Sequence, residues 1–240
     1  MRLAVISDIH GNLAALEAVL ADIDAQVPDH VLCAGDVVGY GPEPEECLNL
    51  VRERDIPCVM GNHEQGVAFP MTRSWFNPQS RKAVDLTAKL ISASSLEYIS
   101  GLPRFLVQDG CRVVHGFPPD EIRTYLFALD ADELASRFPK MNEKANFVGH
   151  THELELVTWD GRVVARRPVQ EGIYPVGEQA FVCNVGSVGQ PRDGDPRAKY
   201  VLWDDTRRTV EVRCVPYDIE RTVARIREQG FPEISAKRLY

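Results

Sequence analysis

The sequence predicts an α/β fold in which two mixed β-sheets pack face to face with helices outside. Its first third alternates short apolar runs with amphipathic stretches, which is typical of parallel strands joined by helices. Its second half contains β-rich runs separated by Asp-Gly, a strong hairpin signal. A chain of 240 residues without an internal repeat is expected to form one domain over 1–240.

The N-terminal third is expected to contain three strands and two helices. Residues 2–7 are apolar with β-branched members, which predicts a buried strand. The stretch after Gly11-Asn12 has apolar residues at spacings of three and four, which predicts an amphipathic helix. Further strands are predicted over 30–34 and 56–60, with a second helix between them near Pro44.

The rest of the chain is expected to be helical first and then rich in hairpins. Residues 66–103 look helical, and two hairpins are predicted around Asp109-Gly110 and Asp160-Gly161. A third hairpin is predicted over 199–215, followed by a closing helix capped by Asp218. The stretch 186–198, rich in Gly, Pro and charge, is the best candidate for a mobile loop.

Composition excludes several functional classes. The net charge of -8 gives no basic footprint for polymeric DNA or RNA. No apolar run reaches the length of a membrane span, and the N-terminal run stops at Ser7, too early for a signal peptide. We therefore expect a cytoplasmic protein without a membrane partner. The six cysteines show no CxxC spacing and are interpreted as buried, reduced thiols.

Five strand-like runs end in side chains able to bind a metal, usually beside a glycine. These side chains are Asp8, His10, Asp36, Asn62, His63, His115, His150 and His152. Ligands gather at the carboxyl ends of strands in open α/β sheets. Residues i and i+2 of an extended chain point the same way, so both members of each two-apart pair should face one site. His30 precedes a strand and is interpreted as structural or exposed.

This residue set predicts metal chemistry. Carboxylate, amide and imidazole ligands without cysteine suit divalent first-row ions such as Mn, Fe, Co, Ni or Zn. Seven ligands are too many for one ion and suit two ions that share a carboxylate. Such a pair can activate water and clamp a phosphoryl group for in-line attack.

The same residues, taken in order, resemble the calcineurin-like metallophosphoesterases. The motifs that carry the resemblance are Asp8-x-His10, Gly35-Asp36, Gly61-Asn62-His63-Glu64, His115-Gly116 and Gly149-His150-x-His152. The resemblance spans 3–152 and implies a four-layer α-β-β-α sandwich. It implies that one ion is bound by Asp8, His10, Asp36 and His152, and the other by Asp36, Asn62, His115 and His150. Asp36 would bridge the ions, and His63 would contact the phosphate and protonate or stabilise the leaving oxygen.

One departure from related subfamilies is informative. Protein Ser/Thr phosphatases and symmetric dinucleoside-tetraphosphate hydrolases carry a phosphate-gripping Arg where this chain has Tyr40, which cannot replace a bidentate cation. This favours the small bacterial and archaeal phosphodiesterase-like branch. Tyr40 either lines the substrate pocket or only packs. Arg192 either supplies the missing cation or is a solvated loop residue. Trp75 and Phe76 form either a lid that stacks a nucleobase or part of a core or interface.

The predicted function is hydrolysis of a small organic or nucleotide phosphoester with two divalent ions, manganese being the expected metal. Asp36, Asn62 and His63 are the predicted catalytic residues. The alternatives are a protein phosphatase, a dinucleoside-polyphosphate hydrolase, a DNA-repair nuclease and a non-catalytic scaffold of the same fold. Scaffolds usually lose ligands, whereas this chain keeps every one. Substrate specificity is expected to come from 66–80, 117–140 and 186–198.

Overall fold

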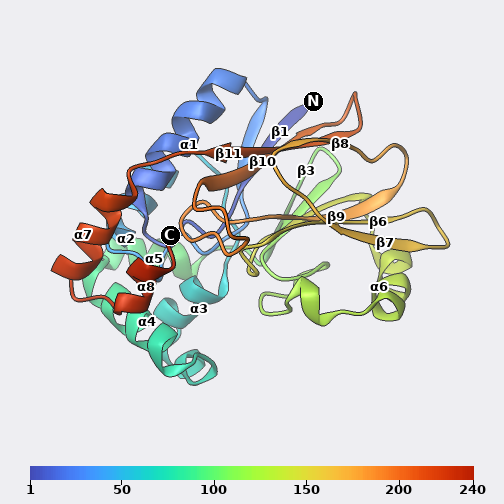
Figure 1. Cartoon of the computed structure of the whole chain (residues 1–240). Coiled ribbons are helices and arrows are strands. Elements are labelled where there is room, and N and C mark those ends of the chain that lie inside the picture. The colour runs from blue at the N-terminus through green and yellow to red at the C-terminus, as the bar shows by residue number, and fades with distance from the viewer.

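Two mixed sheets face each other in the computed structural model, which describes residues 1–240 (Figure 1). The first sheet has five strands, in the order β2 (His30–Cys33), β1 (Arg2–Ile6), β10 (Ala198–Asp204), β11 (Thr209–Val215) and β8 (Gly172–Pro175). Strands β1 and β2 are parallel and the other pairs are antiparallel. The predicted hairpin over 199–215 is therefore confirmed as β10–β11.

The second sheet has six strands. Their order is β3 (Phe105–Gln108), β4 (Cys111–Val114), β5 (Ala145–Val148), β9 (Ala180–Val185), β6 (Leu154–Trp159) and β7 (Val164–Pro168). The three central strands β4, β5 and β9 are parallel, so their carboxyl ends lie at one edge. The two Asp-Gly hairpins are confirmed as β3–β4 and β6–β7.

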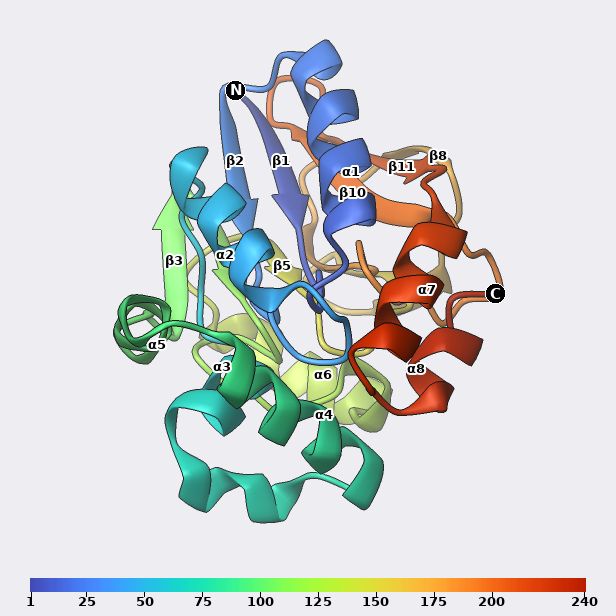
Figure 2. The ribbon, with the colours of Figure 1, turned by 90° about the vertical axis from the view of Figure 1, so that its left-hand side faces the viewer.

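Helices form the two outer layers, and the layers are unequal (Figures 1 and 2). The first sheet is covered by α1 (Leu13–Gln26), α2 (Pro44–Glu53), α3 (Asn62–Ala68), α4 (Pro78–Leu90) and α5 (Ala93–Ser100), with α7 (Ile219–Glu228) and α8 (Glu233–Lys237) beside them. The second sheet is covered by α6 (Ala131–Arg137) and by the 3₁₀ turns η2 (Leu126–Ala128) and η3 (Phe138–Lys140). The predicted four-layer sandwich is thus confirmed. None of its helices is both long and apolar enough to cross a membrane.

The period-2 alternation of the strands builds the layers. In β1, Leu3 and Val5 point into the core between the sheets, whereas Ala4 and Ile6 point toward the helices. Strand β10 divides in the same way, with Trp203 between the sheets and Tyr200 under α1. Strands β1 and β10 are therefore buried on both faces, which explains why most of their residues are apolar.

One sequence-based expectation is wrong, and the structure adds two details that the sequence did not predict. Residues 56–60 do not form a strand: only Cys58 makes a bridge to Cys33, because Pro57 has no N–H and the Met60 N–H donates to the Pro103 carbonyl instead. Strand β8 had no predicted counterpart. The stretch 186–198 is not a uniformly exposed loop, since its first half, 186–191, is buried against the site.

The remaining small predictions fit the structure. His30 is exposed at the start of β2, and its Nε2 lies 3.3 Å from a carboxylate oxygen of Asp109. All six cysteines are free, five of them buried. Asp218 caps α7 by accepting a hydrogen bond from the Arg221 N–H.

Candidate metal centre

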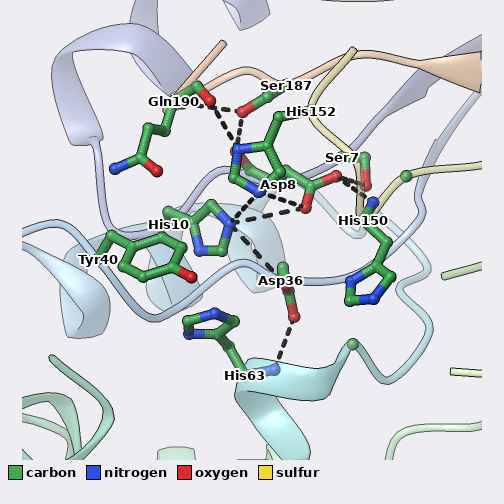
Figure 3. A network of polar contacts seen from close by, with 12 residues as sticks. Ser7, Asp8, His10, Asp36, Tyr40, His63, His150, His152, Ser187 and Gln190 are labelled. Carbon is green, nitrogen blue, oxygen red and sulfur yellow. Dashed lines mark hydrogen bonds and ion pairs between the residues drawn. The ribbon is translucent and has the colours of Figure 1, made fainter. Parts of the chain in front are cut away.

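The predicted side chains meet at the edge where β1, β2, β4 and β5 end. They form two compact groups in which the potential ligand atoms lie within 4.8 Å of one another: Asp8, His10 and His152 in one, and Asp36, His115 and His150 in the other. A third group of His10, Asp36 and His63 links them. Figure 3 shows Asp8, His10 and His152 pointing toward one another, with Asp36 and His63 on the adjoining side.

The first group has a geometry that calls for a cation. His10 and His152 each donate an Nδ1–H to a backbone carbonyl, of Val38 and Gln190 respectively. Their Nε2 atoms, which then carry lone pairs, face each other at 3.0 Å. Oδ1 of Asp8 lies 3.3 Å from Nε2 of His152 and receives no hydrogen bond although it is buried. A positive ion at this point would satisfy all three atoms.

The second group repeats the arrangement on the other side of Asp36. His115 donates its Nδ1–H to the Ala34 carbonyl, which turns Nε2 toward Oδ2 of Asp36 at 3.2 Å and Oδ1 of Asn62 at 3.0 Å. Nε2 of His150 is buried and has no hydrogen-bond partner. The donor set of carboxylate, imidazole and amide fits a divalent first-row ion. A carbonyl behind the ring fixes the tautomer of His115, as it does for His10 and His152.

Asp36 stands between the two groups. Its Oδ1 accepts the His63 N–H at 2.8 Å, while Oδ2 lies 3.2 Å from His115 and 3.8 Å from His10. Burial alone would raise the pKa of this carboxyl, but the neighbouring histidines, His115 first, hold it below its ordinary value. Asp36 therefore stays ionised and is placed to serve both groups.

The histidines respond to this environment in opposite ways. Burial works against the charged form of His115, yet the carboxylate of Asp36 raises the pKa of His115 to about 10. Burial lowers the pKa of His150 to about 3 and that of His152 to about 4. The latter two rings are thus neutral, the state in which imidazole binds metals.

His63 lies at the start of α3 and faces the same space. Its ring centroid is 4.7 Å from that of His10 and 4.5 Å from that of Tyr40, and Nδ1 has no hydrogen-bond partner. Burial holds the pKa of His63 well below its ordinary value. Gly39 packs against this ring with φ +134°, and a side chain there would collide with it.

Glu64 is the last residue of the Gly61-Asn62-His63-Glu64 motif, and the sequence assigned it no role. Its carboxylate accepts hydrogen bonds from the N–H groups of Asp36, Val38 and Gly61, at 2.8, 3.1 and 2.9 Å. Burial, followed by the charge of Asp36, raises the pKa of Glu64 to about 7. The signal was present in the sequence, because an acid three residues after a helix N-cap is a capping-box pattern.

Other supporting groups come from the end of β9 and from the loop that follows it. The Ser187 hydroxyl donates a hydrogen bond to the Asp8 carbonyl and accepts one from the Gln190 N–H (Figure 3). The Gln190 carbonyl in turn accepts the Nδ1–H of His152. Asn184, fully buried, donates to the Gly149 carbonyl and the Thr151 hydroxyl. This loop fixes the backbone on which two of the histidines sit.

The structure shows the surroundings of the four residues whose roles the sequence left open. Tyr40 lines the site, packs on the rings of His10 and His63, and bonds through its hydroxyl to Ser80. The Arg192 guanidinium lies 5.7 Å from the Tyr40 ring centroid and bonds to the Gln190 side chain, so it is close to the site and is not a remote solvated group. Phe76 packs edge-on against His63, whereas Trp75 is 53% exposed.

Comparison with known proteins agrees with this geometry. Residues 1–207 match the model of the calcineurin-like phosphoesterase superfamily domain. An uncharacterised protein of Methanocaldococcus jannaschii is 35% identical over 244 residues, which cover 99% of this chain and 97% of that protein. A metallophosphoesterase from Sphaerobacter thermophilus has a crystal structure with a TM-score of 0.86 and 39% identity, covering 100% of this chain and 98% of that one. A hypothetical protein from Pyrococcus horikoshii has the same fold, with a TM-score of 0.78 and 20% identity over 100% and 97% of the two chains.

Proposed function

The chain belongs to the calcineurin-like phosphoesterase superfamily, and from that premise we propose that it hydrolyses small phosphoesters at a centre of two divalent ions. One observation carries the proposal: two groups of buried ligands, Asp8–His10–His152 and Asp36–His115–His150, adjoin through a single carboxylate. Asn62 completes the second group through its Oδ1. Manganese is the proposed metal, and iron, zinc, cobalt and nickel share the same ligand preferences.

Divalent ions bound there would supply an activated water and neutralise charge on the phosphoryl group. The chain itself supplies the ligands, and His63, beside His10, is the proposed contact with the phosphate. Because burial keeps the His63 ring neutral, we propose that it stabilises the leaving oxygen by donating a hydrogen bond. Arg192, at the edge of the site, is the proposed cation for a substrate oxygen that the ions do not reach.

The direct test is hydrolysis of bis(p-nitrophenyl) phosphate and p-nitrophenyl phosphate with Mn, Co, Ni, Zn or Fe added. We expect metal-dependent turnover and a loss of at least about 10²-fold in kcat for Asp36→Asn, as for removal of one preorganised electrostatic group. The matched control is Asp109→Asn, since Asp109 is also a left-handed aspartate but is exposed in the β3–β4 turn. An inert protein across all metals, or equal activity of the two variants, would contradict the proposal.

The alternatives make different predictions with the same preparation. A protein phosphatase would prefer phosphopeptides, and a dinucleoside-polyphosphate hydrolase would cleave anhydride bonds. Tyr40, in the place of a phosphate-gripping arginine, is the observation against both. A scaffold would bind no metal, whereas the unpaired lone pairs of His150 and Asp8 favour binding.

A further inference from the structure

A cavity of about 280 Å³ opens directly beside the candidate metal centre. Asn62 and His150, two of the proposed ligands, form part of its wall. The organic part of a phosphoester held at the centre would therefore have this cavity beside it. The rest of the lining is mostly aromatic or basic, and its members are Tyr40, Trp75, Phe76, Arg123 and Tyr125, with the polar residues Asn77 and Ser80.

One wall of the cavity is a stack of rings. Tyr125 lies flat on His150, with ring centroids 3.9 Å apart and planes 12° apart. Phe127 continues the stack outward, 4.9 Å from Tyr125 and inclined by 14°. The Tyr125 ring is still 39% exposed, so it presents an aromatic surface next to a proposed metal ligand.

Another part of the lining pairs an aromatic ring with a cation. The Arg123 guanidinium lies 3.5 Å from the ring centroid of Trp75, which is itself half exposed. The acids adjacent to Arg123 in sequence, Asp120 and Glu121, form ion pairs with other arginines. The charge of Arg123 is therefore available to an anionic or electron-rich group in the cavity.

We infer that this cavity binds the planar heteroaromatic group of the substrate, a nucleobase, so that the physiological substrate is a nucleoside phosphoester. The inference rests on the proposed function, because the phosphate must sit at the metal centre. Base stacking on aromatic side chains contributes about 1–3 kcal/mol per base and is largely independent of base identity. The volume lies near the lower end of the range of about 300–1,000 Å³ for small-molecule pockets, which suits one base and not a polymer.

The inference makes Trp75 and Arg123 specificity-determining residues. Neither forms part of the proposed ligand groups, so their removal should leave phosphate binding intact. We expect AMP to inhibit bis(p-nitrophenyl) phosphate hydrolysis with a Ki about tenfold below that of ribose 5-phosphate, which lacks the base. Trp75→Leu and Arg123→Gln should reduce this ratio at least about threefold and leave the Ki of ribose 5-phosphate unchanged.

Matched controls exist on β7 and β8, away from the cavity. Arg167 lies 5.0 Å from the ring centroid of Tyr174, the same cation–ring arrangement away from the cavity. Tyr174→Leu and Arg167→Gln should leave the ratio as in the wild type. Equal Ki values for AMP and ribose 5-phosphate, in a protein that hydrolyses the test ester, would overturn the inference while the proposed function stood.

A second readout does not depend on turnover. Base stacking should quench the fluorescence of Trp75 when AMP is added to the metal-loaded protein, and Trp75→Phe should abolish the change. Ribose 5-phosphate should produce none. Quenching by AMP without hydrolysis under any metal would support the cavity assignment and contradict the proposed function. Hydrolysis without quenching would count against the cavity assignment alone.

Discussion

The site residues occupy an uncommon backbone conformation. Nine non-glycine residues have positive φ, and five of them are Asp8, His10, Asp36, His150 and His152. Left-handed backbone costs of order 1–3 kcal/mol per residue and collects at functional sites. The two members of each two-apart pair were expected to face one site because the chain would be extended there. The chain is not extended at these residues, so that reason is wrong. The chain turns at each ligand, and His150 and His152 enter different groups.

Glu64 is the residue that holds the turn at Asp36. Glu64→Gln replaces one accepting oxygen with a donor that faces a backbone N–H, so at least one of its three hydrogen bonds is lost. We expect a loss of about 1–3 kcal/mol in the free energy of unfolding and about 10–100-fold weaker metal binding. Urea denaturation and metal titration would measure the two effects.

A control for Glu64 is provided by α6. Glu133 is also the third residue of a capping box, with its carboxylate on the Asp130 N–H, but it is exposed and far from the metal ligands. Glu133→Gln should cost less than about 1 kcal/mol and leave metal affinity unchanged. Similar metal affinities for the two variants would show that Glu64 acts only as a helix cap.

At the level of elements, the sequence predicts what periodicity and turn chemistry encode. The hairpins at Asp109-Gly110 and Asp160-Gly161 and the amphipathic helix after Asn12 form where they are expected. The differences from the predictions lie in segments whose structure depends on which strands are available for pairing. Strand β8 exists because Gly172–Pro175 meets the free edge of β11. Residues 56–60 make only a single bridge, because Pro57 has no N–H and the N–H groups of Ile56 and Met60 donate to Val51 and Pro103.

The candidate site divides in the same way. Its proposed ligands were readable because each lies in a short motif, and all but Asn62 follow a strand; the structure brings all of them together. The roles of Tyr125, a single side chain in an aperiodic stretch, and of Asn184, near the end of β9, were not readable from the sequence. Their proximity to His150 and Gly149 arises only from the packing of distant segments.

A partly buried network attaches α1 to the first sheet. Asp22 accepts hydrogen bonds from the Arg213 guanidinium and the Tyr200 hydroxyl. These bonds, that of Arg213 first, hold the pKa of Asp22 below its ordinary value. We expect Asp22→Asn to lower the free energy of unfolding by about 2 kcal/mol at pH 7, measured by urea denaturation.

The pH dependence of this loss has a definite sign. Because the folded-state pKa of Asp22 lies below the unfolded value of about 3.9, its contribution is complete above that pH and disappears as the pH falls through the folded-state value. The difference between wild type and variant should therefore shrink below about pH 4. Asp24→Asn is the control on the same helix: its ion pair with Arg54 is exposed and should be worth less than about 1 kcal/mol. A difference independent of pH would contradict the assignment.

On the scale of the whole molecule, the candidate centre joins the two sheets. Asp8, His10 and Asp36 follow strands of the first sheet, whereas His115, His150 and His152 follow strands of the second. Between the two sheets lies a core of 20 buried hydrophobic residues. Bound cations would therefore cross-link the layers at the edge where the ligands meet, in a protein whose net charge is -8.

Metal removal should therefore weaken the whole sandwich and not only the loops at its edge. At a metal concentration 100-fold above the dissociation constant, binding to the folded state adds about 2.7 kcal/mol to the free energy of unfolding. We expect manganese to raise the melting temperature by several degrees and EDTA to reverse the rise, with hydrogen exchange slowing on both sides of the interface, in 8–12 and in 149–152.

His115→Asn should lose most of this response because it removes a proposed ligand from the second sheet, whereas His30→Asn, which changes an exposed histidine, should retain all of it. A melting temperature that does not change with metal in the wild type, or exchange that slows on one sheet only, would mean that the ligands do not join the layers.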